Sequence, residues 1–277
     1  MCTTCGCGHD DHVKIMKPNA VDASIEVKTF SPVESHSHSH DHFHNHGHNH
    51  NGHTHHHGDT LTKDVVALER DILHQNDLAA SRNRGFFDAK NITVFNLVSS
   101  PGSGKTSFLE RCLTDLRDEL DFFVIEGDQQ TLNDAQRIEA VKVPVIQINT
   151  GKGCHLDGDM VHRALKQLDI TDNAVLMIEN VGNLVCPAMF DLGEDKRIVI
   201  ISTTEGEDKP LKYPDMFHGS QICIINKIDL LPYVNFNVEK AKEYALRLNP
   251  DLIFFEVSAT NGEGMDAFYS WLKSNKK

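Results

Sequence analysis

Residues 99–106 constrain the fold of this chain more than any other segment. They read Ser-Ser-Pro-Gly-Ser-Gly-Lys-Thr and join an apolar run, 92–98, to a segment that opens a helix. Gly102 and Gly104 let backbone N–H groups wrap a phosphate, and the helix N-terminus adds partial positive charge. A loop of this kind needs a buried strand before it and a helix after it. We therefore expect an α/β fold of the P-loop NTPase type.

The rest of the chain supports this fold class. After Thr60, short β-branched runs alternate with amphipathic segments, which predicts a mostly parallel sheet flanked by helices, with ligands at the carboxyl ends of the strands. The predicted strands are 92–98, 122–126, 145–148, 174–178, 198–202, 222–226 and 252–257. The predicted helices are 108–116, 160–168, 238–248 and 265–272, with an earlier helix from Asp59 or Thr60 to about Ser81.

The phosphate loop assigns a role to each of its polar residues. The backbone of Gly102, Ser103 and Gly104 is expected to cradle the phosphates, and Lys105 to neutralise the β and γ oxygens as a catalytic residue. Thr106 would hold Mg²⁺, and Ser107 continues the nucleotide-binding turn. One position departs from the usual pattern, because Ser99 stands where a first glycine is common and lacks its positive-φ freedom.

A second motif, Asn226-Lys227-Ile228-Asp229, specifies the base. A carboxylate accepts two parallel hydrogen bonds from a ring N–H and a neighbouring amine, and guanine presents that pair where adenine does not. Asp229 therefore favours GTP over ATP, with Asn226 and Lys227 in support. Ser258 and Ala259 follow the last predicted strand as a second guanine-contacting loop. Three motifs in order, each at a strand end, indicate a Mg²⁺-dependent GTPase.

Two further strand ends carry carboxylates. Asp128 lies in the run Glu-Gly-Asp-Gln-Gln-Thr, and Glu179 in the run Glu-Asn-Val-Gly-Asn. Either could orient the attacking water or hold Mg²⁺ through water, so both are candidate catalytic residues. The sequence does not decide which of them acts on water.

Composition limits the compartment and the partners. A net charge of −13 argues against a sequence-independent nucleic-acid binder, which needs a positive surface. No segment is long and apolar enough to span a bilayer, and no leader pattern is present, so we expect a cytoplasmic protein without a membrane partner. The cysteines number seven and are unevenly spaced, which favours free thiols over a disulfide framework.

Three regions follow from the composition. Residues 1–8 are a cysteine motif, residues 9–59 a His-rich segment, and residues 60–277 the GTPase domain. Histidine alternates with Ser, Asn, Asp and Gly in the second region, which offers little to bury, so we expect it to be disordered without metal.

The first region is a predicted metal site. Cys2, Cys5 and Cys7 place three thiols within six residues, and Gly6 lets the backbone fold so that all face one ion. With the α-amine as a fourth donor, such a set suits planar Ni²⁺ as well as tetrahedral Zn²⁺, so ligand type alone does not choose the metal.

A second candidate metal site lies inside the GTPase domain. Cys154 and His155 follow the predicted strand 145–148, and Cys186 follows Glu179 by a short segment. Two thiolates and an imidazole could hold one metal, with water or a second subunit completing the coordination. Because segments that contact the γ-phosphate rearrange on hydrolysis, a metal held here would respond to the nucleotide state.

Together these motifs resemble the HypB family, GTPases of the dimeric SIMIBI class that help insert nickel into nickel–iron hydrogenase. The resemblance covers nearly the whole chain and rests on Cys-x-x-Cys-Gly-Cys at 2–7, the His tract, the phosphate loop 99–106, the runs at 127–131, 153–155 and 179–187, and the base motif 226–229.

The resemblance implies a function and partners. It implies a tight nickel site at Cys2, Cys5 and Cys7, a weaker nickel or zinc site at Cys154, His155 and Cys186, and GTP-linked homodimerisation. It also implies a HypA-type nickel chaperone and the hydrogenase large-subunit precursor as partners. Nickel storage by the tail is an added function that the residues themselves suggest.

Three alternatives remain at this point. A urease-type nickel GTPase has no reason to carry Cys2 to Cys7, and a zinc-delivering GTPase should show adjacent cysteines after the phosphate loop, where this chain has none. A nickel buffer with a vestigial GTPase fold is disfavoured by the intact Lys105, Thr106 and Asp229.

Overall fold

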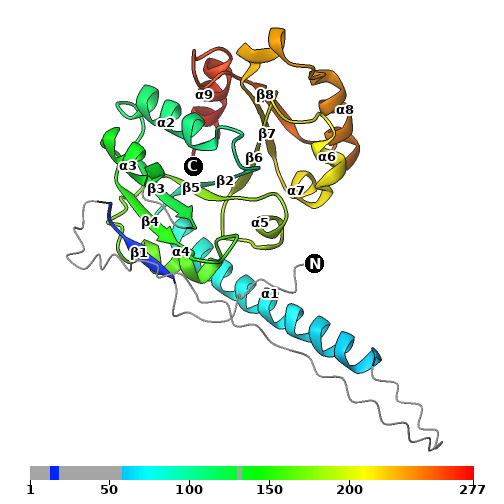
Figure 1. Cartoon of the computed structure of the whole chain (residues 1–277). Coiled ribbons are helices and arrows are strands. Elements are labelled where there is room, and N and C mark those ends of the chain that lie inside the picture. The colour runs from blue at the N-terminus through cyan, green and yellow to red at the C-terminus, as the bar shows by residue number, and fades with distance from the viewer. Residues whose placement is uncertain (1–12, 19–57, 130–132) are drawn as a thin grey trace, which may run out of the picture.

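A computed structural model describes residues 13–18, 58–129 and 133–277. In this part of the chain the strands form one eight-stranded sheet in the order β1-β4-β3-β5-β2-β6-β7-β8 (Figure 1). Only the edge strand β1 is antiparallel to its neighbour within that sheet. The predicted α/β class with a mostly parallel sheet is therefore confirmed.

The bounds of the elements are as follows. The strands are β1 Lys14–Met16, β2 Thr93–Ser99, β3 Phe122–Asp128, β4 Val145–Asn149, β5 Val175–Gly182, β6 Lys196–Ser202, β7 Ile222–Asn226 and β8 Ile253–Glu256. The helices are α1 Gly58–Ala89, α2 Lys105–Leu116, α3 Asn133–Ala140, α4 Gly158–Leu165, α5 Cys186–Met189, α6 Lys209–Lys212, α7 Pro214–His218, the 3₁₀ helix η2 Ile228–Tyr233, α8 Val238–Leu248 and α9 Met265–Ser274.

Helices cover both faces of the sheet, which explains why its central strands are mostly apolar on both faces. On β2, Phe95 and Leu97 belong to the core that α2 and α9 cover, whereas Val94 belongs to the core that α1 and α4 cover. A third cluster packs β6 and β7 against α7 and α8. Successive strand residues point to opposite faces, so a strand buried on both sides has no polar alternation. The carboxyl ends of the parallel strands are left free to carry polar side chains.

Helix α1 is longer than its sequence pattern predicts. The spacing of apolar residues ends near Ser81, but the helix continues through Gly85 to Ala89 and extends beyond the edge of the sheet at its N-terminal end (Figure 1). Tertiary contacts explain the extension, because Phe87 is buried in the core and the Asn83 amide donates to the carbonyls of Gly158 and Leu192. These contacts offset the helix-weakening effect of the glycine.

Strand β1 corrects the expectation of disorder for a short part of the segment 9–59, of which residues 9–12 and 19–57 lie outside the described structure. Lys14–Met16 pair with Asn149, Ile148 and Gln147 of β4. Without this strand, β4 would be an uncovered sheet edge, and Val13 and Ile15 pack against the apolar cluster beneath it. Pairing with an open edge satisfies backbone groups that composition alone does not reveal.

The structure adds elements that periodicity did not predict, chiefly α3 and the short helices α5, α6 and α7. They have too few turns to show a helical repeat in the sequence. Among the described residues, no helix is long and apolar enough to cross a membrane.

Candidate functional site

The phosphate loop lies between β2 and α2, as its motif requires. Two glycines there have left-handed backbone conformations, with φ of +77° at Gly102 and +89° at Gly104. Gly104 is the N-cap of α2, so the free N–H groups of the first helical turn point into the loop. Ser103 Oγ is buried and without a hydrogen-bond partner in the described structure, which leaves it available to a ligand oxygen.

Ser99 does not need to be glycine. Positive φ in this loop falls at Gly102 and Gly104, and Ser99 is not among the described non-glycine residues with positive φ. Its hydroxyl donates to the Ser100 carbonyl at 3.0 Å. The departure at this position therefore costs no backbone strain.

Lys105 and Thr106 both contact Glu179, which lies in β5 three residues before the strand ends. The Lys105 ammonium lies 2.6 Å from Glu179 Oε1, and the Thr106 hydroxyl donates to the same oxygen at 2.6 Å. Lys105 is 8% exposed and Glu179 is fully buried. Glu179 Oε2 is buried and has no hydrogen-bond partner within the described residues. The structure thus brings together the proposed phosphate-neutralising Lys105, the proposed Mg²⁺ ligand Thr106 and a carboxylate with a free buried oxygen.

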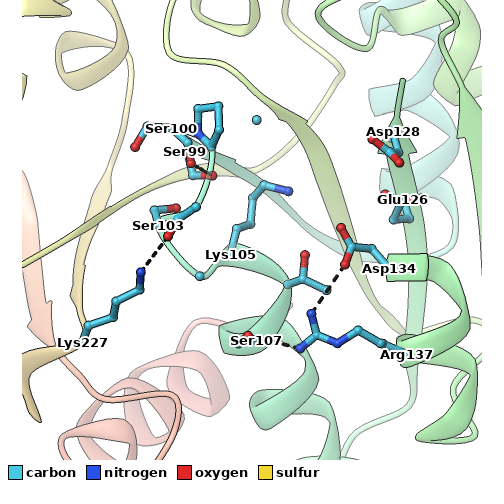
Figure 2. Close-up of a pocket in the computed structure, with 16 residues that line it drawn as sticks. Ser99, Ser100, Ser103, Lys105, Ser107, Glu126, Asp128, Asp134, Arg137 and Lys227 are labelled. Carbon is cyan, nitrogen blue, oxygen red and sulfur yellow. Dashed lines mark hydrogen bonds and ion pairs between the residues drawn. The ribbon is translucent and has the colours of Figure 1, made fainter. Parts of the chain in front are cut away.

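A pocket of about 430 Å³ opens over this loop. Figure 2 shows Lys105 extending into it from α2, with Asp128 and Glu126 of β3 on the opposite wall. Asp128 is half-buried, and its Oδ1 accepts a hydrogen bond from Gln129 N at 2.7 Å. Asp128 ends β3, whereas Glu179 lies inside β5, which continues beyond the predicted strand to Gly182; both carboxylates stand beside the phosphate loop.

Glu126 is a pocket residue that the motifs did not single out. It is 1% exposed, and burial, reinforced by the neighbouring Glu179 and only partly opposed by Lys105, raises its pKa from the usual value near 4.5 to about 9. The signal was present in the sequence, because residues 126 and 128 share one face of a strand. Without the structure, Glu126 looked like one more strand residue.

Arg137 is a second residue that the sequence did not reveal, because α3 was not predicted. Its guanidinium donates to Ser107 Oγ at 3.1 Å and lies 2.5 Å from Glu110 Oε2 (Figure 2 shows the first contact). Ser107, which the sequence predicts to bind the nucleotide, lines the pocket and is hydrogen-bonded to α3 through Arg137.

The base motif is tied directly to the phosphate loop. The Asn226 amide donates to the carbonyl of Ser103 at 3.0 Å, and its oxygen accepts from Ala259 N at 3.2 Å. Lys227 donates to the Gly102 carbonyl at 2.7 Å (Figure 2). Asn226 and Lys227 therefore position the loop, whatever else they contact when a nucleotide is bound.

Asp229, the residue that the sequence predicts to bind the base, has an oxygen without a partner in the described residues. It lies in η2, directly after this clamp, and its Oδ1 is buried without a hydrogen-bond partner in the described chain. Such an oxygen costs free energy unless a ligand donor fills the position. Ser258 is fully buried and its hydroxyl accepts from Asn261 N, which shapes the loop that brings Ala259 to Asn226.

The three residues of the candidate inner metal site lie close together. Cys154 Sγ lies 2.8 Å from Cys186 Sγ and 3.8 Å from His155 Nδ1, and the three ligand atoms lie within 4.8 Å of one another. Cys154 and His155 come from the loop between β4 and α4, and Cys186 begins α5. Two sulfurs and one imidazole this close suit a soft divalent cation and leave room for a further ligand.

His155 is held in the form that binds metal. Its ring stacks on Phe190, with centroids 3.9 Å apart, and the side chain is 6% exposed. Burial lowers the His155 pKa from 6.5 to about 4. The imidazole is therefore neutral at physiological pH, with a nitrogen lone pair available for coordination.

Other candidate ligands cannot be placed. Cys2, Cys5 and Cys7, and with them the proposed motif at 1–8 and the His tract, lie outside the described residues. Cys112 and Cys223, by contrast, are fully buried in the core and belong to its packing.

Comparison with known proteins identifies a family. Residues 93–256 match the model of the CobW/HypB/UreG nucleotide-binding domain. The chain is 46% identical to the hydrogenase maturation factor HypB of Escherichia coli K12 over 301 aligned residues, covering 100% of this chain and 99% of that protein. It is 56% identical to HypB of Rhizobium leguminosarum over 209 residues, 76% of this chain and 70% of that protein.

Solved structures agree with the sequence comparison. The crystal structure of Helicobacter pylori HypB in complex with nickel superposes with a TM-score of 0.69 at 39% identity, covering 73% of this chain and 95% of that one.

Proposed function

Because this chain belongs to the CobW/HypB/UreG family and, within it, to the HypB hydrogenase maturation factors, we propose that it is a GTP-hydrolysing chaperone that delivers nickel to a nickel–iron hydrogenase during maturation. Nickel is its cargo rather than a resident cofactor.

One observation carries this proposal. Glu179, beside the phosphate loop, and Cys186, in the metal cluster, lie on one short segment that runs from the second half of β5 into α5. Glu179 Oε1 contacts Lys105, and seven residues later Cys186 Sγ contacts Cys154. A nucleotide that moves Glu179 therefore acts on the same segment that holds the cargo.

The pocket residues suit GTP hydrolysis. Lys105 is positioned to exchange Glu179 for phosphate oxygens, and the free Asp229 oxygen matches the donor edge of guanine. The residues also fit Mg²⁺, because Thr106 converges with Glu179 and one oxygen of Glu179 is buried without a partner among the described residues. When bound there, Mg²⁺ would neutralise phosphate charge. Asp128 and Glu179 remain the two candidates for orienting the attacking water.

The metal cluster suits a site that must release its cargo. Cys154, His155 and Cys186 offer three ligand atoms, whereas structural zinc sites close with four. An incomplete set leaves a position through which a partner can capture the ion. The same ligands accept Zn²⁺, so we expect Ni²⁺ and Zn²⁺ to compete for this site.

Partners follow from the family and from the surface beside the cluster. We propose a GTP-linked homodimer, a HypA-type nickel chaperone and the hydrogenase large-subunit precursor as partners. Val185 and Met189, which flank Cys186, are 55% and 54% exposed, unusual for large apolar side chains next to a buried core. We further propose that Cys2, Cys5 and Cys7 form a separate tight nickel site and that the tail stores nickel.

The proposal is tested by combining turnover with nickel delivery. Wild-type chain and Lys105→Ala are loaded with Ni²⁺ and mixed with the hydrogenase precursor and GTP, while phosphate release and hydrogenase activity are followed. We expect wild type to hydrolyse GTP and activate the hydrogenase, and the variant to bind Ni²⁺ but do neither. Equal slow hydrolysis by both proteins, with equal metal binding, would instead support a nickel buffer with a vestigial GTPase.

A further inference from the structure

We propose that Asn180 is a positioning residue that couples the nucleotide pocket to the inner metal site by holding the metal-binding loop through a backbone hydrogen bond. This inference rests on the proposed function and names the contact through which nucleotide state reaches the cargo.

Asn180 lies between the two sites in both sequence and space. It follows Glu179 on β5, so its side chain points to the face opposite the one that carries the Glu179 carboxylate. There its Oδ1 accepts a hydrogen bond from Leu156 N at 3.1 Å, one residue after His155. Asn180 is fully buried, so water does not compete for this contact.

The strand is irregular at this point. Leu97 of β2 pairs with Glu179, whereas Ser99 pairs with Gly182, so Asn180 and Val181 together oppose the single residue Val98. This is a β-bulge, a feature that re-aims side chains near functional sites. The Val181 N–H donates to Asn180 Oδ1 at 2.9 Å, so the side chain also holds the bulge. The segment that would move is therefore already displaced from regular pairing.

Leu156 is held from a second direction by the other carboxylate strand. Its fully buried side chain lies against Gly127, where a Cβ would come within 2.8 Å of it. Gly127 stands between Glu126 and Asp128 on β3. The residue next to His155 is thus clamped by both strands whose carboxylates line the phosphate loop.

The third contact of Asn180 reaches the strand that feeds the phosphate loop. Its Nδ2 donates to Asn96 Oδ1 on β2 at 3.3 Å, and Asn96 in turn donates to Glu194 Oε1 at 3.0 Å. Asn96 is fully buried as well. Asn180 is therefore anchored to Asn96 on β2 and holds the backbone of Leu156 in the metal-binding loop.

These contacts give the coupling a direction. Without nucleotide, one oxygen of Glu179 holds both Lys105 and Thr106. Phosphate oxygens compete for the same two groups, so binding changes the forces on Glu179 and on the bulge beside it. Because Leu156 depends on Asn180, the position of His155 and Cys154 follows. A nucleotide then alters metal affinity only as far as its two states differ in these contacts.

The test is an affinity ratio. Full-length chain with Cys2, Cys5 and Cys7 replaced by serine is titrated with Ni²⁺ in the presence of GDP and of a non-hydrolysable GTP analogue. We expect the two affinities to differ by about 5- to 150-fold, the usual range for linked sites. Asn180→Ala in the same background is expected to bring the ratio close to 1 while still binding Ni²⁺ and nucleotide.

Asn83→Ala is the matched control. Asn83 is equally buried and donates to the Gly158 and Leu192 carbonyls, so its bonds join α1 to the start of α4 and to the loop after α5 rather than to a strand beside the phosphate loop. We expect Asn83→Ala to lower the free energy of unfolding and to leave the ratio of the two Ni²⁺ affinities unchanged. If Asn180→Ala keeps the same ratio of Ni²⁺ affinities as the background, the inference is overturned. The proposal that the wild type delivers nickel would not be affected by that result. A ratio of 1 in the chain that lacks only Cys2, Cys5 and Cys7 would also overturn the inference, because the nucleotide would then have no effect on Ni²⁺ affinity.

A measurement on the unmodified chain guards against a variant that does not fold. Hydrogen exchange of the Leu156 amide reports its bond to Asn180 directly. We expect its protection to differ between the GDP and analogue complexes. Equal protection in the two complexes contradicts the inference without any mutation.

Discussion

Glu126 and Glu179 occupy paired positions on the adjacent parallel strands β3 and β5, and both carboxylates are buried. Paired residues of parallel strands share a face of the sheet, so the two acids are neighbours. One ammonium, that of Lys105, serves the pair, and it contacts Glu179. Because the one cation contacts Glu179, a proton on Glu126 is favoured, consistent with the pKa of Glu126 near 9.

The first prediction concerns the pH dependence of stability. The folded-state pKa of Glu126 is raised from near 4.5 to about 9, so the folded chain binds the extra proton between these values. Its stability contribution is therefore fully present below about pH 4.5 and is lost as pH rises towards 9. Glu126→Gln mimics the protonated acid. At pH 8, without nucleotide or Mg²⁺, we expect it to be more stable by roughly 1–3 kcal/mol.

Urea unfolding of both proteins at a series of pH values measures this difference. The gap should close as the pH falls towards 4.5, because the carboxyl of the unfolded chain then also binds a proton and folding no longer takes up an extra one. A gap independent of pH would show that Glu126 does not titrate in this range. Glu263→Gln, at an exposed position in the loop before α9, is the control and should leave the pH profile unchanged.

The second prediction concerns the base. Asp229→Asn replaces one of the two acceptors facing guanine with an amide donor, so a donor then meets a donor. We expect GTP affinity to fall by about 100- to 1,000-fold, because a buried donor is left unpaired. Xanthosine triphosphate, which carries an oxygen where guanine has its amine, should bind the variant better than GTP does. Competition binding measures both values.

Asp251→Asn is the control for that experiment. Asp251 is exposed at the turn before β8, and its replacement should leave both affinities unchanged. If Asp229→Asn also preferred GTP, the carboxylate would not be the group that reads the base.

The positions of the motif residues could be predicted from the sequence, whereas contacts between segments far apart in the chain could not. Lys105, Asp128 and Glu179 come from segments that follow apolar runs, and the carboxyl ends of parallel strands meet at one edge of a sheet, so their approach around the phosphate loop could be foreseen. Contacts between distant residues could not. The extension of α1 depends on Asn83 bonding to residues far along the chain, and β1 depends on an open edge of β4.

The same limit applies inside the site. The raised pKa of Glu126 depends on its pairing with Glu179, which is fixed by the register of β3 on β5. The bulge at Asn180 depends on how β5 pairs with β2. Register is a property of two strands, and neither strand carries it alone.

The third prediction concerns the inner metal site. In a chain whose Cys2, Cys5 and Cys7 are replaced by serine, we expect Cys186→Ser to lower Ni²⁺ affinity by more than about 100-fold, because one of three converging ligands is lost. Cys223→Ala is the control, since Cys223 is fully buried in β7 and distant in sequence from the cluster. It should cost about 1–2 kcal/mol of stability and leave Ni²⁺ affinity unchanged. Equal affinities in all three proteins would remove Cys186 from the site.

The fourth prediction separates two glycines of the phosphate loop. Gly102 and Gly104 both have positive φ, so alanine strains the backbone at either position, by about 1 kcal/mol. They differ in their surroundings. A Cβ at Gly102 meets nothing within 4 Å, whereas one at Gly104 comes 2.6 Å from the Asn226 amide nitrogen. Gly104→Ala must therefore displace the Asn226 side chain, which ties the base motif to the loop.

Without nucleotide, we expect Gly104→Ala to lose at least 1–2 kcal/mol more stability than Gly102→Ala, about the contribution of the hydrogen bonds that Asn226 makes. Thermal unfolding of the two variants measures this difference. Equal losses of stability in the two variants would mean that only the backbone conformation requires Gly104 and that Asn226 can move without losing free energy.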